Sequence, residues 1–320
     1  MIKKVTMMDL AREVGCSQTQ ISRVFNGQPK VSPELRSRVL EIAQKMNYRN
    51  QANNHLIRIG FIEDAFNSFY SSNLLYHVMK CTNKLHWNCI PIDITNSNIL
   101  NHFLFDGIIS NVLNKSWIYE LSASQNLPLV MINSYDFPLE KVCSVNPDEE
   151  NATELILKHL KELGHRKIVR VHLSDVETAH RGRNSFLRSA AKLNLAGSVV
   201  NCEDSLEKPL EDILLPLIQQ GFTAIYMIHQ HLALPAARII QQAGYRIPED
   251  ISLVTYEIEG ISESLYPAHT TLAFDYEALV ERALRELYRR IRGENVSGGV
   301  IRFPNRLIVR ESTGPCRSEC

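Results

Sequence analysis

The 320-residue chain lacks the long apolar segments and paired cysteines that identify membrane and disulfide-rich proteins. No run approaches the roughly 18 apolar residues of a membrane-spanning helix, so we expect no membrane partner. The first residues contain no apolar stretch of signal-peptide length, which predicts a cytoplasmic protein. The seven cysteines are scattered without a CxxC pair, which is typical of reduced thiols.

The compact motifs of catalysis and nucleotide binding are also missing. The sequence contains neither a GxGxxG nor a P-loop, and neither a GxSxG elbow nor an HExxH helix. His229 and His231 form the only close histidine pair, and a place in a loop or cleft wall is favoured for them over metal binding. We therefore expect no cofactor, no metal and no enzymatic activity.

The first fifty residues, in contrast, carry a clear pattern of two short helices, a tight turn and a longer third helix. Thr6 and Ser17 are good helix caps, and Gly15 supplies the permissive backbone that the turn needs. Ser32 followed by Pro33 predicts the start of the third helix. The apolar residues recur at helical spacing and predict one buried face: Met7, Leu10, Ala11, Val14, Ile21, Val24, Phe25, Leu35, Val39, Ile42, Ala43 and Met46.

Charge separates this head from the rest of the chain. Residues 1–58 contain ten Lys and Arg against four Asp and Glu, a net charge of +6, whereas the remaining 262 residues carry −6. A three-helix bundle without a DNA-binding role would need no such excess of basic residues. A basic head on an acidic body is typical of a module that binds nucleic-acid phosphates, so the pattern predicts a helix-turn-helix that binds DNA.

Strands alternate with helices after residue 58, which predicts parallel sheets covered by helices on both faces. The expected strands are 57–62, 88–94, 106–110, 127–133, 143–146, 167–173, 222–228 and 251–257, and the expected helices are 73–85, 147–163, 181–193, 232–243 and 276–292.

Motifs along almost the whole chain resemble those of the lactose-repressor/galactose-repressor family of bacterial transcriptional regulators. Besides the head, they are LGHRKI (163–168), GYRIPEDISLVTYE (244–257), PAHTT (267–271) and RLIVREST (306–313). The resemblance implies an α/β fold, with a three-helix helix-turn-helix head and a two-lobed body like that of periplasmic binding proteins. The expected divisions are a head of 1–48, a hinge of 49–58 and a body of 59–320, with lobe one at 59–146 and 275–298 and lobe two at 147–272 and 300–320.

The family binds double-stranded operator DNA as a homodimer, with the second helix in the major groove. By position, Gln18, Thr19 and Arg23 match the residues that read bases. Glutamine can pair bidentately with adenine and arginine with guanine, which suits that role. The other expected DNA contacts are Thr6, Ser17, Gln20, Ser22, Asn26, Lys30 and the minor-groove wedge Leu56.

Three features depart from the family pattern. The tract between Arg49 and Ile59 is about six residues shorter than usual and rich in Asn, which disfavours a hinge helix. The segment between Asp93 and Asp106 is too short for the full helix that the family places there. In the ligand cleft, Gly182 stands where the family has an arginine.

The resemblance implies a small ligand in the cleft at the carboxyl ends of the strands. The expected effector contacts are Phe69, Tyr70, Arg181, Arg183, His229, Gln230 and Glu257. Aromatic rings with forked polar groups suit a carbohydrate or polyol, and arginine suits a carboxylate or phosphate. For each residue a plain structural role is the alternative.

The favoured function is a DNA-binding regulator, with repression the favoured sign, controlled by a carbohydrate-related effector. Three alternatives remain: a regulator whose cleft binds no small molecule, a sugar-binding transport protein with the same body, and an α/β enzyme. The last two are disfavoured, because the chain has a DNA-binding head and shows no catalytic constellation.

Overall fold

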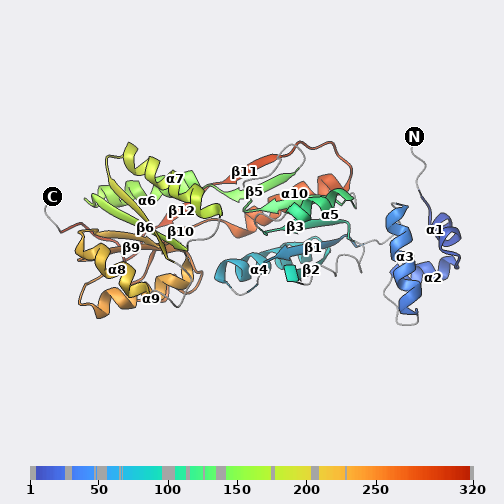
Figure 1. Cartoon of the computed structure of the whole chain (residues 1–320), viewed down its shortest axis with the longest axis horizontal. Coiled ribbons are helices and arrows are strands. Elements are labelled where there is room, and N and C mark those ends of the chain that lie inside the picture. Colours follow the sequence, from blue (N-terminus) through green and yellow to red (C-terminus); the bar gives the residue numbers. More distant parts are fainter. Residues whose placement is uncertain are drawn as a thin grey trace.

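The computed structural model describes most of the chain in three parts: a helical head and two α/β lobes (Figure 1). The described residues are 5–25, 31–46, 48, 56–64, 66, 68–95, 105–112, 116–124, 127–134, 142–173, 177–202, 209–227 and 229–317. Among them, no helix combines the length and the apolar character needed to cross a membrane.

The head consists of α1 (Met7–Val14), α2 (Gln18–Phe25) and α3 (Pro33–Lys45). Its core is the apolar face expected from the sequence. Leu10, Ile21 and Val39 are fully buried, and the Tyr48 ring stacks on Phe25 at 5.6 Å. All three predicted helices are therefore confirmed.

Lobe one is built on a sheet with the strand order β11-β5-β4-β3-β1-β2, parallel at every pair. Helices α4 and α10 pack on one face through a core that includes Phe61 and Leu287, and α5 packs on the other face. The elements are β1 (Arg58–Glu63), α4 (Phe69–Lys84), β2 (Asn88–Asp93), β3 (Gly107–Ser110), α5 (Ser116–Ser124), β4 (Leu129–Ile132), β5 (Cys143–Pro147), α10 (Tyr276–Ile291) and β11 (Gly299–Phe303).

Lobe two repeats this architecture with the order β12-β10-β9-β8-β6-β7, in which only β12 runs antiparallel to its neighbour. One face is covered by α6 and α7, and the other by α8 and α9. The elements are α6 (Glu149–Glu162), β6 (Lys167–Leu173), α7 (Glu177–Lys192), β7 (Ala196–Cys202), α8 (Leu210–Gln219), β8 (Ala224–Met227), α9 (Gln230–Gln242), β9 (Ser252–Tyr256), a 3-10 turn (Ser262–Ser264), β10 (Thr270–Ala273) and β12 (Arg306–Ile308).

Three segments cross between the lobes: β5 to α6, β10 to α10, and β11 to β12. The first and third are joined by hydrogen bonds. Asp148 caps α6, its N–H donates to the carbonyl of Phe303 at 2.7 Å, and its own carbonyl accepts from Asn305 Nδ2 at 2.7 Å. The Asn305 N–H donates to Asn151 Oδ1 at 2.8 Å. We call these four residues the crossover clamp.

The architecture confirms the predicted fold class, with differences in detail. The sequence pattern did not predict α5, β7, α8, β10, β11 or β12. Residues 299–303 pair with β5 in the sheet of lobe one, whereas the sequence placed 300–320 in lobe two. After Asp93 the described chain forms a single turn to Thr95, and residues 96–104 of the shortened segment lie outside the described residues.

Candidate DNA interface and interlobe site

The turn between α1 and α2 is fixed by reciprocal caps. The Asp9 N–H donates to the Thr6 hydroxyl, and the Thr6 N–H donates back to the Asp9 carboxylate at 2.9 Å. The Ser17 N–H donates to Gln20 Oε1 at 3.0 Å, and the Gln20 N–H donates to the Ser17 hydroxyl at 3.2 Å. Gly15 ends α1 in the left-handed region, with φ at 77°. Because these bonds satisfy N–H groups at both helix starts, each helix begins at a defined residue.

The cap leaves one face of α2 exposed and polar. Ile21 and Val24 are buried against the rest of the head, whereas Gln18, Thr19 and Arg23 are exposed on the opposite side. These three are the predicted base readers, and the fold places all of them on one surface. A helix with this surface has the dimensions of the major groove and the donors and acceptors to read it.

The remaining predicted DNA contacts fall into three groups. Thr6, Ser17 and Gln20 serve as helix caps, which adds a structural role to the predicted one. Ser22 is half-buried on α2, and Leu56 is 53% exposed two residues before β1. Asn26 and Lys30 lie outside the described residues.

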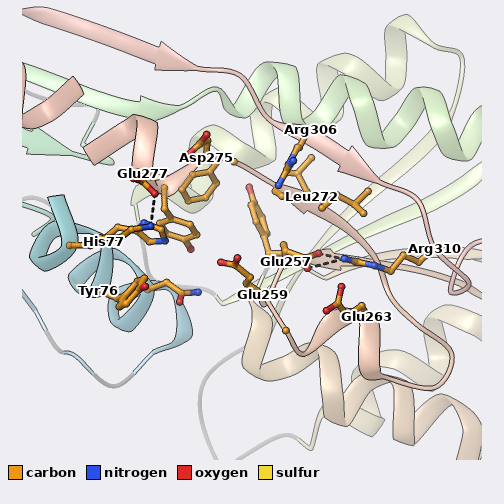
Figure 2. Close-up of a pocket in the computed structure, with 18 residues that line it drawn as sticks. Tyr76, His77, Glu257, Glu259, Glu263, Leu272, Asp275, Glu277, Arg306 and Arg310 are labelled. Atoms are coloured by element: carbon orange, nitrogen blue, oxygen red, sulfur yellow. Dashed lines mark hydrogen bonds and ion pairs between the residues drawn. The ribbon is translucent and has the colours of Figure 1, made fainter. Parts of the chain in front are cut away.

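A cavity of about 680 Å³ lies between the lobes, beside the β10-to-α10 crossover (Figure 2). Helix α4 supplies Tyr76 and His77 from lobe one, and the chain after β9 supplies Glu257 and Glu259 from lobe two. The crossover contributes Tyr276, whose ring stacks on His77 with 5.5 Å between centroids and an 8° interplanar angle. The other lining residues are Asn73, Lys80, Tyr256, Gly260, Glu263, Leu272, Ala273, Phe274, Asp275, Glu277, Arg306, Ile308 and Arg310.

Glu257 is the predicted effector residue that lines this cavity, and it is held by an ion pair. Its two carboxylate oxygens accept from Arg310 at 2.8 and 2.9 Å, and one of them also accepts from the Thr271 hydroxyl. Burial alone would raise the pKa of Glu257, but the hydrogen bonds from Arg310 and Thr271 outweigh it and lower the pKa. The carboxylate is therefore ionised and fixed in direction at neutral pH.

None of the other predicted effector residues whose side chains the structure describes is among those that line this cavity. Tyr70 packs its ring against Phe274 and Tyr276, with centroids 6.2 and 6.0 Å away. Phe69 begins α4 and is 38% exposed. His229 takes the N-cap position of α9 and is half-buried, and Arg183 is exposed on α7. Arg181 and Gln230 lie in helices, but their side chains fall outside the described residues.

Lobe two contains a buried ion pair that the sequence analysis missed. Arg170, in the middle of β6, has a side chain only 3% exposed and donates to Glu149 at 2.6 Å. Burial lowers the pKa of Arg170, but the charge and hydrogen bond of Glu149, together with the nearby Tyr226 and Tyr256, outweigh it and keep the pKa above its ordinary value. A Cβ on Gly182 would lie 1.9 Å from Nη2 of Arg170, so this glycine makes room for the guanidinium. The sequence signal for this ion pair was an arginine in the middle of the largely aliphatic strand KIVRVHL.

Lobe one holds a second unpredicted group, the buried carboxylate of Glu63. It ends β1, is 4% exposed and accepts from Asn111 Nδ2 at 2.7 Å. The Asn111 Oδ1 in turn accepts from the Tyr70 hydroxyl at 3.2 Å. An acid that closes the apolar run IRIGFI would have indicated it, because a buried carboxylate requires hydrogen-bond partners.

One group of side chains has the spacing of a metal site. Cys81, Glu277 and Glu281 bring ligand atoms within 4.8 Å of one another. However, Glu277 already accepts from Lys80 at 2.7 Å and from Lys84, and burial raises the pKa of the Cys81 thiol to about 11. A protonated thiol is a poor metal ligand, and so is a carboxylate whose charge is already paired with two lysines.

Comparison with protein families supports the division into head and body. Residues 6–51 match the family described as "Bacterial regulatory proteins, lacI family", and residues 157–313 match the "Periplasmic binding protein-like domain". Catabolite control protein A of Priestia megaterium is 25% identical over 97% of this chain and 99% of its own length. The ribose operon repressor of Haemophilus influenzae is 26% identical over 96% of this chain and 98% of its own length.

Solved structures share the same architecture. A lac repressor dimer bound to operator and the anti-inducer ONPF has a TM-score of 0.71 at 22% identity, covering 98% of this chain and all of that one. A LacI family transcriptional regulator from Enterococcus faecium with bound ribose also has a TM-score of 0.71 at 22% identity, covering 81% of this chain and all of that one. These similarities establish the fold.

Proposed function

Since the chain belongs to the lacI family of bacterial regulatory proteins, we propose that it is a DNA-binding transcriptional regulator whose DNA affinity is set by a small ligand. The observation that carries this proposal is the joining of an exposed polar α2 face to a body with a cavity between its lobes. We propose that the protein binds DNA and ligand without catalysing a reaction. We also propose that it represses transcription and that it acts in the cytoplasm.

The head reads DNA through α2. Gln18, Thr19 and Arg23 face the major groove, and the capped helix starts lie against phosphates, where N–H groups favour negative charge. One head covers a half-site, so specific recognition calls for two heads on a pseudo-palindromic operator. We therefore propose a homodimer, the assembly named for the solved lac repressor relative.

The ligand site is the interlobe region around Glu257, Tyr70 and the aromatic residues of the β10-to-α10 crossover, Phe274 and Tyr276. Aromatic surfaces beside fixed carboxylates suit a carbohydrate-related effector, and structures of relatives are described with ribose and with cellobiose. A ligand that contacts both lobes favours the closed arrangement, which changes the relation of the two heads on DNA. The remaining proposed contacts are Phe69, Arg181, Arg183, His229 and Gln230.

One observation favours a second candidate, a regulator with an unresponsive cleft. Glu257, at the expected ligand position, is already paired with Arg310 and Thr271 inside the protein. A thermal-shift screen of sugars, sugar acids and phosphosugars separates the two candidates. A stabilising compound that also changes operator affinity supports the responsive regulator, and a screen without any such compound supports the second candidate.

The DNA proposal is tested on an operator selected from random-sequence duplexes. Affinity should fall steeply with salt because binding rests on phosphate contacts, and a salt-independent affinity contradicts the proposal. Arg23→Ala should cost about 1–3 kcal/mol on the operator and relax specificity at one base pair per half-site. Lys45→Ala, at an exposed position on α3, is the matched control and should leave sequence preference unchanged. Equal losses on specific and non-specific DNA for Arg23→Ala would exclude it as a base reader.

A further inference from the structure

The carboxylate of Glu63 lies at the carboxyl end of β1, the edge of the lobe-one sheet that faces lobe two. It is buried beneath the first turn of α4, where the Ser71 hydroxyl is also a hydrogen-bond partner. The Asp64 N–H donates to its Oε1 at 3.1 Å, and Asn111 Nδ2 donates to its Oε2 at 2.7 Å. These partners are neutral donors, so the negative charge is solvated by hydrogen bonds without a counter-ion among them.

Asn111 connects this carboxylate to the wall of the interlobe site. Its backbone is fixed by an N–H bond to the carbonyl of Ile62 at 2.9 Å, and its side chain is buried. Because Nδ2 donates to Glu63, Oδ1 faces the Tyr70 hydroxyl and accepts its proton at 3.2 Å. Tyr70 then packs on Phe274 and Tyr276, both of which line the cavity.

Each member of this chain has a fixed number of donors and acceptors, so the direction of one bond sets the next. An ionised Glu63 can only accept, which orients Asn111 and commits the Tyr70 proton to Asn111. A protonated Glu63 donates its O–H to Asn111 Oδ1 after a half-turn of the amide. The amide nitrogen then donates to the Tyr70 oxygen, and the Tyr70 proton turns away from Asn111.

We propose that Glu63, Asn111 and Tyr70 form a proton-controlled hydrogen-bond relay directly behind the residues Phe274 and Tyr276 that line the interlobe cavity. One proton, taken from solvent onto Glu63, reverses the relay and converts Tyr70 from an acceptor into a donor on the side away from Asn111. The relay rests on the proposed function in one respect: it makes Tyr70 a contact of the effector.

The surroundings of Glu63 place this proton exchange near neutral pH. Burial raises the pKa of Glu63 to about 7, with a further rise from the Asp64 charge, against the lowering effect of the hydrogen bonds from Asn111, Asp64 and Ser71. On the neighbouring strand β2, the register partner of Glu63 is Asp93, whose carboxylate accepts from Thr95. From α4, the facing groups are the hydroxyls of Ser71 and Tyr70.

The relay assigns two classes of effector to two protonation states. A ligand that presents hydroxyl donors, such as a neutral sugar, is favoured while Glu63 is ionised and Tyr70 accepts. A ligand that presents an acceptor, such as the carboxylate of a sugar acid, is favoured when Glu63 is protonated and Tyr70 donates. Binding of a sugar acid should therefore take up a proton, and binding of a neutral sugar should not.

The test is a pH titration of the full chain by NMR, with selective labels on Glu carboxyl carbons, Asn side-chain amides and Tyr Cζ. We expect the Glu63 carboxyl to titrate near pH 7, and the Asn111 amide and Tyr70 Cζ to shift with the same midpoint. Asp64→Asn should lower that common midpoint. Glu63→Gln, which keeps the shape of the side chain, should abolish the pH response of Asn111 and Tyr70. Glu154→Gln, at an exposed site on α6, is the matched control and should leave it unchanged.

A Glu63 midpoint between pH 4 and 5 would overturn the relay, as would Asn111 and Tyr70 signals that do not follow Glu63. A merely structural Glu63 would not move those two signals. The titration needs no ligand, so it is independent of the effector screen. A working relay in a protein that fails the screen would refute the ligand-controlled regulator and leave the relay standing.

Discussion

The two lobes share one architecture but treat charge at the interlobe site in opposite ways. In lobe two, the described charges near the site are paired with charges of opposite sign: the buried Arg170 with Glu149, and the partly buried Glu257 with Arg310. In lobe one, Glu63 is surrounded by neutral hydrogen-bond donors. A carboxylate paired with arginine keeps its charge across the physiological range, whereas a buried carboxylate with neutral partners exchanges its proton near neutrality. The paired charges of lobe two therefore stay constant with pH, whereas the relay proposed for lobe one responds to it.

The largest expected effect comes from breaking the buried pair in lobe two. Arg170→Met should lower the free energy of unfolding by about 3–5 kcal/mol, because it leaves the Glu149 carboxylate without its counter-ion. Denaturant unfolding measures the change. An effect below about 1 kcal/mol would show that the pair does not hold lobe two together.

A double-mutant cycle at Gly182 is the control for that prediction. Gly182→Ala should be destabilising in the native background, because the new Cβ meets the Arg170 guanidinium at 1.9 Å. The same substitution should cost much less in the Arg170→Met background, where a flexible apolar chain replaces the planar group. Equal costs in both backgrounds would place the strain elsewhere.

Removal of the titrating acid in lobe one should change the pH dependence of stability. The pKa of Glu63 is raised from 4.5 to about 7 on folding, so the folded state binds more protons between these values. Its stabilising contribution is complete below pH 4.5 and is lost as pH rises through 7, a change of about 3 kcal/mol. Glu63→Gln should remove this slope from a series of unfolding curves between pH 4.5 and 8. An unchanged slope would mean that another group titrates there.

The paired carboxylate at the cavity should show the opposite dependence. Glu257→Gln should cost about 1–3 kcal/mol at pH 7, because Arg310 and Thr271 lose a charged acceptor. The pKa of Glu257 is lowered on folding, so its contribution is present above pH 4.5 and is lost as pH falls through the folded value. The native and Glu257→Gln proteins should therefore converge in stability once the pH has fallen below the folded-state pKa of Glu257. We also expect the variant to lose effector response while keeping operator affinity.

The smallest expected effect concerns a buried hydroxyl in lobe two. Thr153 on α6 is 1% exposed, and among the described residues its hydroxyl has no hydrogen-bond partner. Thr153→Val keeps the shape and removes the unsatisfied group, so it should be neutral or stabilising by up to about 1 kcal/mol. A clear loss of stability would show that the Thr153 hydroxyl does have a hydrogen-bond partner, such as an ordered water.

The sequence predicted the regular elements well where a single local signal sufficed. The three helices of the head begin at cap residues, and β6 was predicted at its observed bounds because four of its seven residues, Ile168, Val169, Val171 and Leu173, are aliphatic. The missed strands β10, β11 and β12 are three to five residues long, and their place is decided by pairing with distant strands. Short segments carry too little periodicity to reveal such long-range pairing.

The candidate site was less predictable, for a different reason. The position of Glu257 beside the cavity follows from the end of a strand, which a sequence pattern can indicate. The ion pair of Glu257 with Arg310 cannot be predicted in this way, because 53 residues separate the two and only the sheet brings them together. The same holds for Glu63 and Asn111, which are 48 residues apart, and for the fit of Arg170 against Gly182.

The crossover clamp has a mechanical consequence for lobe motion. It joins the first and third crossings by hydrogen bonds, whereas the second crossing, at Phe274 and Tyr276, is bordered by aromatic contacts that can slide. The clamped strands β11 and β5 form one edge of their sheet, and β12 and β10 form the corresponding edge of the other. Motion about such a pinned edge is a rotation, and displacement grows with distance from the axis. The strands β2 and β7, at the far edges, should therefore travel furthest, and a pair of spectroscopic labels placed there would amplify a small rotation at the clamp into a measurable change of distance.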